Sequence, residues 1–100
     1  MYTLYYSPGA CSLAVHALLV ETGVPCTLKN VSIASGANRQ QEFLQINPRG
    51  QVPVLEADGK VLKEGGAILL NLCERHPNAW MPQAGTPGRD EALEWLLYCN

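Results

Sequence analysis

The chain of 100 residues has a formal net charge of −2 and is 47% hydrophobic, which fits one globular domain with a single core. Its charged residues are few and scattered, with no basic run and no basic face interleaved with aromatic residues. Neither nucleic acid nor an anionic membrane is therefore expected as a partner. The start of the chain lacks the pattern of a signal peptide, and no apolar run reaches the roughly 18 residues of a membrane span. We therefore expect a cytosolic protein.

Residues 2–6 are aromatic and β-branched and end at a Ser-Pro-Gly turn, which predicts a strand. Apolar residues then recur at helical spacing from residue 11 until Gly23 and Pro25 stop the helix. Residues 26–33 predict a second strand. This strand, helix and strand order favours a parallel pair with a right-handed crossover.

The second half of the chain predicts a different arrangement. Residues 35–39 form a loop, and residues 40–45 a short helix with Phe43 and Leu44 buried. An Asp-Gly pair between two apolar runs is a strong hairpin signal, so strands over residues 52–56 and 60–62 should be antiparallel. A helix over residues 67–74 follows and ends before Pro77.

The last twenty residues change character. Residues 81–88 are rich in proline and glycine and are predicted to link a first domain, residues 1–80, to a helix over residues 89–100. That helix carries Leu93, Leu96 and Leu97 on one stripe. A helix of about a dozen residues is marginal alone in water. It therefore docks on the first domain, pairs with another chain or begins a domain that the 100 residues do not contain.

Four cysteines without Cys-x-x-C or metal-ligand spacing, Cys11, Cys26, Cys73 and Cys99, predict free thiols and no metal site. Cys26 and Cys73 fit a core, and Cys99 the last helix. Cys11 lies where the first turn meets the first helix, and the positive end of a helix favours a nucleophilic thiolate. A buried structural cysteine is the alternative.

Ser7 and Ser12 bracket the same turn and could hydrogen-bond a substrate sulfur, although capping of the helix is the better expectation for Ser12. His16, further along the helix, is expected to be structural. Glu64 precedes a helix start with two glycines. Exposed N–H groups there suit a carboxylate, and the Glu64 side chain suits an ammonium group, so an amino-acid head group would satisfy both. Glu64 could instead only complement the helix dipole.

Pro53 should open a strand, because proline is excluded from strand interiors. The residues alone leave two alternatives. One is an ordinary trans proline. The other is a cis bond that turns the N–H and C=O of Val52 outward, where they can pair with an extended peptide as another strand would.

Three segments in order, residues 5–13, 46–55 and 64–68, resemble the N-terminal domain of the cytosolic glutathione transferases, most closely the bacterial beta class. The resemblance implies an α/β, thioredoxin-like βαβ-α-ββα domain with a mixed four-stranded sheet, followed by the start of an all-α domain. It also implies a cis Pro53, and glutathione bound as a co-substrate.

The resemblance assigns residues to the parts of glutathione. Val52 would pair with the cysteinyl backbone, with Gln51 and Pro53 beside it. Glu64 and the N–H of Gly65 would hold the γ-glutamyl end. Cys11 would lie at the sulfur, with a catalytic role shared by Ser7 and accessory roles for Tyr5 and Tyr6. Arg39 is a candidate replacement for the lysine that beta-class members place near the glycine carboxylate, and Lys63 stands where they have serine or threonine.

The implied activity is conjugation of glutathione to a small electrophilic substrate by a homodimer. The 100 residues would then be a fragment, because in this family the helical domain forms most of the electrophile pocket. Two alternatives remain open. One is a glutaredoxin-like thiol-disulfide reductase, and the other is a binding or assembly module without catalysis.

Overall fold

The computed structural model describes residues 2–77 and 81–99. The elements follow one another as β1 (Tyr2–Tyr6), α1 (Leu13–Thr22), β2 (Cys26–Asn30), a 3-10 turn (Ala37–Arg39), α2 (Gln41–Leu44), β3 (Val54–Ala57), β4 (Lys60–Lys63), α3 (Gly65–Arg75) and α4 (Pro87–Cys99). No helix in these two ranges is both long and apolar enough to cross a membrane.

The four strands form one mixed sheet in the order β2-β1-β3-β4. Strands β1 and β2 are parallel, whereas β3 is antiparallel to both of its neighbours. Val54, the first residue of β3, lies opposite Tyr5 on one side and Lys63 on the other. This arrangement confirms the predicted fold class.

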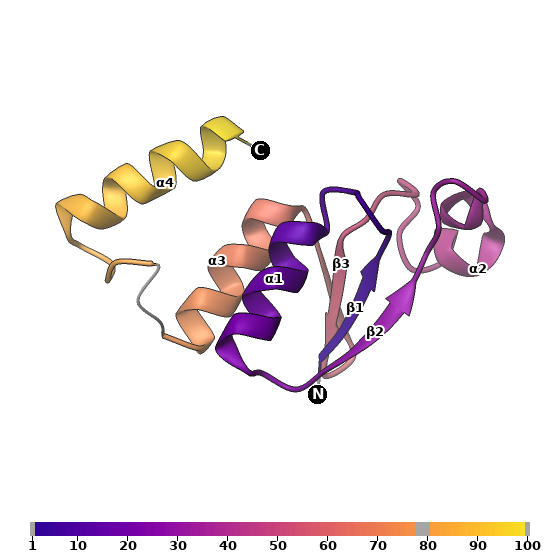
Figure 1. Cartoon of the computed structure of the whole chain (residues 1–100), viewed down its shortest axis with the longest axis horizontal. Coiled ribbons are helices and arrows are strands. Elements are labelled where there is room, and N and C mark those ends of the chain that lie inside the picture. The colour runs from indigo at the N-terminus through magenta and orange to yellow at the C-terminus, as the bar shows by residue number, and fades with distance from the viewer. Residues whose placement is uncertain (1, 78–80, 100) are drawn as a thin grey trace.

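Strand residues alternate between two cores on opposite faces of the sheet. Leu4 and Leu55 face α1 and α3 and join the larger core with Val15, Leu19, Ile68 and Leu72. Tyr5 and Val54 point the other way, toward Phe43 of α2. Figure 1 shows α1 and α3 together on one side of the sheet and α2 on the other.

Several predicted boundaries differ from the structure. Strand β3 starts at Val54, directly after Pro53, instead of residue 52, and two other differences have clear physical reasons. The second strand ends at Asn30 instead of residue 33, because the chain turns toward the first loop, where the Ile33 N–H donates to Ser7 Oγ at 3.1 Å. The third helix starts at Gly65 instead of residue 67. Its first turn therefore takes in both glycines, which the sequence left outside the helix.

Helix α4 starts at Pro87, inside the predicted linker. Proline suits the first helical position because it needs no N–H partner there, and Thr86 Oγ1 accepts the Arg89 N–H at 3.2 Å, as an N-cap does. Of the predicted leucine stripe, Leu93 and Leu96 are half-buried, whereas Leu97 is 68% exposed. Residue 100 and the side chain of Cys99 lie outside what the structure describes.

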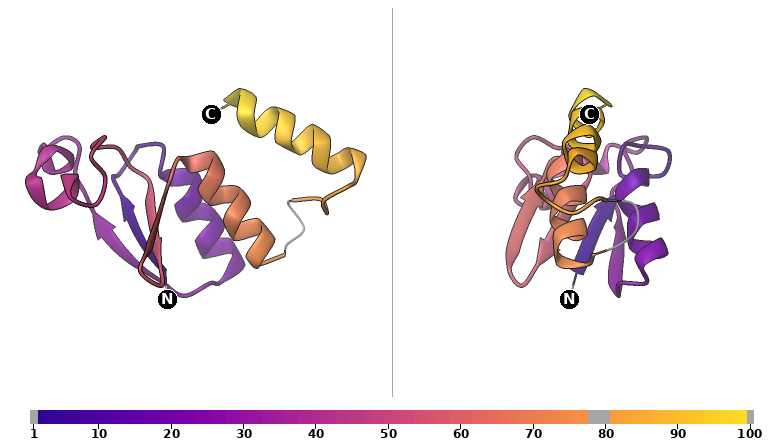
Figure 2. Two further views of the ribbon diagram at one scale, coloured as in Figure 1. Left: turned by 180° about the vertical axis from the view of Figure 1, so that it is seen from behind. Right: turned by 90° about the vertical axis from the view of Figure 1, so that its left-hand side faces the viewer.

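One arginine joins α4 to the first domain. The Arg89 guanidinium donates to the Pro82 carbonyl at 3.1 Å and to Glu74 Oε1 of α3 at 3.3 Å. Figure 2 shows α4 beyond the layer of α1 and α3, with its carboxyl-terminal end turned back toward that layer. Among the described residues of α4, Leu96 lines the two cavities beside α1 and α3.

The turn before β3 depends on Gly50. Its φ of +67° lies in the left-handed region, and its N–H donates to the Asn47 carbonyl at 2.9 Å. The Gly50 carbonyl accepts Asn38 Nδ2 at 2.9 Å. A Cβ at this position would lie 3.0 Å from the Asn38 carbonyl oxygen, so the turn and the 3-10 segment approach each other too closely for a side chain.

Substitution Gly50→Ala should lower the free energy of unfolding more than the matched control Gly23→Ala. Gly23 has a similar φ of +72° but open space around its Cβ position, so its cost is the left-handed backbone alone, about 1–2 kcal/mol. Gly50→Ala adds a backbone clash of at least about 1 kcal/mol. Urea unfolding measures both, and equal losses would contradict the close approach at Gly50.

Candidate functional site

Sheet topology brings three distant segments to one edge. Because β3 runs antiparallel to β1 and β4, the end of β1, the start of β3 and the end of β4 lie side by side. The loop after β1 carries Cys11, the segment before β3 carries Val52 and Pro53, and the residue after β4 is Glu64. Side chains that are up to 53 positions apart in the sequence therefore meet around one cavity.

The cavity has a volume of about 760 Å³. Six of the seven residues predicted for the site line it: Cys11, Gln51, Val52, Pro53, Glu64 and Gly65. The exception is Ser7. The rest of the lining comes mainly from the amino-terminal halves of α1 and α3, the 3-10 segment and the 47–50 turn, with Leu96 of α4.

Cys11 is exposed at the cavity, two residues before α1. The loop that presents it is closed by two buried serines. The Ser7 N–H donates to Ser12 Oγ at 3.1 Å, and the Ser12 hydroxyl donates to the Ser7 carbonyl at 3.2 Å. Ser12 therefore holds the loop closed and makes no capping bond to the helix, so the capping expectation is wrong.

Ser7 is only 5% exposed, and its hydroxyl oxygen accepts the Ile33 N–H. This position joins the Cys11 loop to the segment after β2. The geometry favours a structural role for Ser7, and its contact with a ligand stays a prediction.

The two tyrosines proposed as accessory groups do not line the cavity. Tyr5 is buried on the opposite face of the sheet, with its ring centroid 5.9 Å from that of Phe43, so its accessory role is wrong. The Tyr6 ring lies 5.4 Å from the His16 ring, which agrees with a structural role for His16.

The Val52-Pro53 peptide bond is cis, as predicted. Val52 is half-buried at the cavity, and Pro53 and Val54 are buried behind it. Within the described ranges, the N–H and C=O of Val52 make no hydrogen bond. Both groups can therefore pair with the backbone of an extended ligand.

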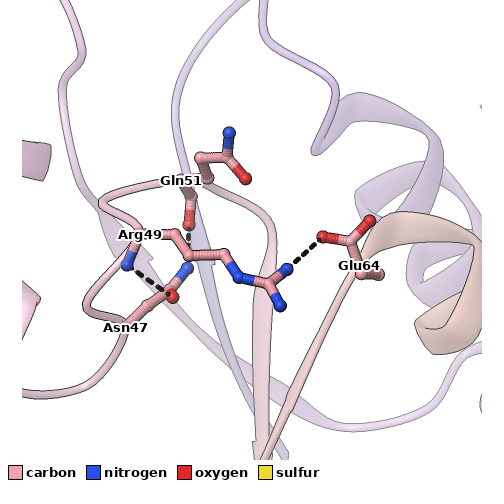
Figure 3. Close-up of polar contacts among 4 residues, drawn as sticks. All are labelled: Asn47, Arg49, Gln51 and Glu64. Carbon is pink, nitrogen blue, oxygen red and sulfur yellow. Dashed lines mark hydrogen bonds and ion pairs between the residues drawn. The ribbon is translucent and has the colours of Figure 1, made fainter.

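Glu64 connects β4 to α3 with a φ of +72°, which is unusual for a residue with a side chain. Its carboxylate forms an ion pair with Arg49, with Nη1 to Oε2 at 2.9 Å, and both side chains are more than 60% exposed. Figure 3 shows the Arg49 side chain extended from its turn toward Glu64. Exposed pairs of this kind add at most about 1 kcal/mol to stability.

Sequence reasoning missed Arg49. The two partners are 15 positions apart on separate loops, so no helical or strand spacing links them. The sequence signal that could have indicated Arg49 is its positive charge in the turn that precedes the predicted cis proline.

Positive charge dominates the lining of the cavity. Arg39, Arg49 and Lys63 are opposed there by the single carboxylate of Glu64. An excess of positive charge in a concave site attracts an anionic ligand. The position of Arg39 agrees with its predicted role near a carboxylate, although that role stays a prediction.

The thiols differ in environment. Burial raises the pKa of Cys26, and a backbone hydrogen bond with Leu4 lowers it by a smaller amount. Cys73 is half-buried on α3, and Cys11 is exposed. Because the thiolate is the reactive form, Cys26 is a poor nucleophile at neutral pH.

The strand order and the helices on both faces define a thioredoxin-like domain, and its cis proline lines the same cavity as an exposed thiol. The family described as "Glutathione S-transferase, N-terminal domain" matches residues 1–74. The chain belongs to this family.

Relatives and solved structures agree with this assignment. The chain is 38% identical over 98 residues to glutathione S-transferase GstA of Escherichia coli O157:H7, covering 95% of this chain and 49% of the relative. A glutathione transferase structure from Methylococcus capsulatus is 44% identical with a TM-score of 0.87, covering 98% of this chain and 50% of that one. A homologue from Sulfitobacter, crystallised with bound glutathione, is 29% identical with a TM-score of 0.90, covering 98% and 48%. The chain thus spans about half the length of these proteins.

Alkylation should separate the thiols by environment. With limiting iodoacetamide near neutral pH, Cys11 should react first because it is exposed, and Cys26 should lag because its raised pKa keeps it protonated. Raising the pH should speed Cys26 as its thiolate fraction grows. Peptide mass mapping measures both rates, with protein unfolded in urea as the control in which the difference disappears. Faster reaction of Cys26 than of Cys11 in the folded protein would contradict the description of these sites.

Proposed function

We propose that the chain is the glutathione-binding domain of a glutathione transferase, in which the glutathione thiolate attacks a small electrophilic substrate. The observation that carries this proposal is the single cavity that collects Cys11, Val52 and Glu64 from three separate segments. Its volume of about 760 Å³ lies within the range of about 300–1,000 Å³ for small-molecule sites.

Glutathione fits the cavity as an extended tripeptide. Its cysteinyl backbone pairs with the N–H and C=O of Val52, and its γ-glutamyl ammonium meets Glu64. Its sulfur then lies at Cys11, and its glycine carboxylate points toward Arg39. Two carboxylates and one ammonium give glutathione a negative net charge, which matches the excess of positive charge on the lining.

The chemistry follows from the position of the sulfur. Hydrogen bonding at the loop before α1 stabilises the glutathione thiolate, and Cys11 supplies the side chain at that point. The thiolate then forms a bond to the electrophilic carbon, and the leaving group departs with the electron pair of the bond that breaks. The proton lost by glutathione goes to solvent.

Thiol-disulfide exchange is a second candidate, because Cys11 is an exposed thiol and can itself become a nucleophile. Its thiolate would attack the glutathione sulfur of a glutathionylated substrate and release the substrate thiol. A second glutathione thiolate would then attack the mixed disulfide, yielding oxidised glutathione and restoring Cys11.

The electrophile, a homodimeric state and a cytosolic location belong to the same proposal. Helix α4 carries three large apolar side chains that are more than half exposed, Trp95, Leu97 and Tyr98. Exposed apolar side chains in one place favour packing against further helices or another chain. Packing of these residues against additional helices would complete a pocket for the second substrate.

Substitution Cys11→Ser should separate the two reactions. A serine hydroxyl still donates a hydrogen bond, so conjugation to a chloronitrobenzene should fall by no more than about tenfold, the value of one such bond. Exchange with a glutathionylated peptide should stop, because no thiol remains at the site. Both rates are measured on the same protein, with Cys26→Ser as the control that keeps both.

Continued exchange in the Cys11→Ser variant would show that another thiol reacts. A wild-type protein that shows neither reaction and does not bind glutathione in calorimetry would overturn the proposed function itself.

A further inference from the structure

The ion pair of Arg49 and Glu64 places a cation and an anion side by side on the lining of the cavity. The two charged groups come from different loops and lie 2.9 Å apart. No serine, threonine or tyrosine is among the described residues that line the cavity. Recognition of a carboxylate in this region therefore falls to backbone N–H groups, to amide side chains such as that of Gln51 and to cationic side chains, of which only the cations bring an opposite charge.

Both partners keep unused capacity for hydrogen bonds. A guanidinium has five N–H donors, and in the described structure only one Nη1 contact engages the Arg49 side chain. Glu64 receives that contact on Oε2, whereas Oε1 accepts no hydrogen bond from the described residues. A ligand can therefore bind to both groups without breaking the pair.

Resting on the proposed function, we propose that Arg49 and Glu64 together recognise the zwitterionic head of the γ-glutamyl residue. Glu64 accepts hydrogen bonds from the α-ammonium, and Arg49 donates to the α-carboxylate in the fork geometry that guanidinium groups make with carboxylates. Arg49 is thus a specificity-determining residue that selects glutathione over thiols without an α-amino-acid head.

Hydrogen bonds within the turn fix the backbone of Arg49 relative to the rest of the site. Its N–H donates to Asn47 Oδ1 at 3.1 Å, and Asn47 Nδ2 donates to the Gln51 carbonyl at 2.8 Å. Asn47 is only 2% exposed, so this turn is anchored in the interior. Because the turn leads directly to Val52, it relates the position of Arg49 to the group that pairs with the cysteinyl backbone.

In the alternative hypothesis Arg49 has only an electrostatic role. It neutralises the charge of Glu64 or makes the electrostatic potential of the whole cavity more positive. The two hypotheses differ in which part of the ligand determines the effect of Arg49. Direct contact makes the effect of Arg49 depend on the ligand's α-carboxylate, whereas a general field acts on every anionic ligand that the cavity accepts.

The experiment pairs protein variants with two ligands that cannot form disulfides. One is S-methylglutathione. The other replaces its γ-glutamyl residue with 4-aminobutyryl, which keeps the ammonium and lacks the α-carboxylate. Calorimetry on wild type should show tighter binding of S-methylglutathione, by about tenfold for one charge-assisted contact at an exposed site. In Arg49→Gln, affinity for S-methylglutathione should fall about tenfold while affinity for the analogue does not fall, so the preference disappears.

Two further variants sharpen the test. Arg49→Lys keeps the charge without the fork and should keep only part of the preference. Lys63→Gln removes one positive charge from the same lining and measures the general field. It should weaken binding of S-methylglutathione more than that of the analogue, because only S-methylglutathione carries a net negative charge. Arg49→Gln should lower the preference further than Lys63→Gln does. The exposed Arg49 side chain can be replaced without loss of its backbone bond to Asn47, and circular dichroism checks that the fold is kept.

A loss of preference in Arg49→Gln no greater than the loss in Lys63→Gln, or no loss of affinity for either ligand, would overturn the role of Arg49 while leaving glutathione binding intact. Failure of the wild-type protein to bind S-methylglutathione would overturn the proposed function, and the role of Arg49 with it.

Discussion

The candidate site depends on the pairing of Val54. This residue begins β3 between Tyr5 of β1 and Lys63 of β4, and its side chain is fully buried. Because both neighbours run antiparallel to β3, each reaches its carboxyl end beside Val54. Register is strongly specified where a face is buried, since a slip of one residue would turn Val54 and Leu55 to the wrong cores. The loops that follow β1 and β4 are thereby held next to the cis proline, on a rigid scaffold.

Polar groups buried under these loops fix their shape. Asn47, three residues after α2, donates its N–H to the Phe43 carbonyl at 2.8 Å, and both polar atoms of its side chain are bonded within the turn. Ser7 and Ser12 close the Cys11 loop in the same way. Buried polar groups that are fully hydrogen-bonded specify one arrangement, because any other would leave them unpaired. The exposed groups Cys11 and Arg49 thus stand on loops whose interior side is ordered.

The sequence predicted most of the fold because its signals were local. Alternation, an Asp-Gly turn and helix stops placed every strand and the long helices, and the three motifs with their order predicted the family and the residues around the cavity. It did not predict contacts that depend on three-dimensional proximity. Ser12 bonds to Ser7 instead of capping α1, and Arg49 pairs with Glu64 across two loops. The sequence also does not show that Pro87 starts a helix instead of belonging to the linker, because proline serves both as a breaker and as a first helical residue.

In the proposed function three loops form one binding site for glutathione, and amide chemical shifts test this most directly. Titration of isotope-labelled protein with S-methylglutathione should shift the amide signals of Cys11, Val52 and Gly65 together, with one dissociation constant. Leu28, exposed on the edge strand β2, should stay unchanged. Shifts at only one of the three loops, or a separate dissociation constant for each, would contradict a single site.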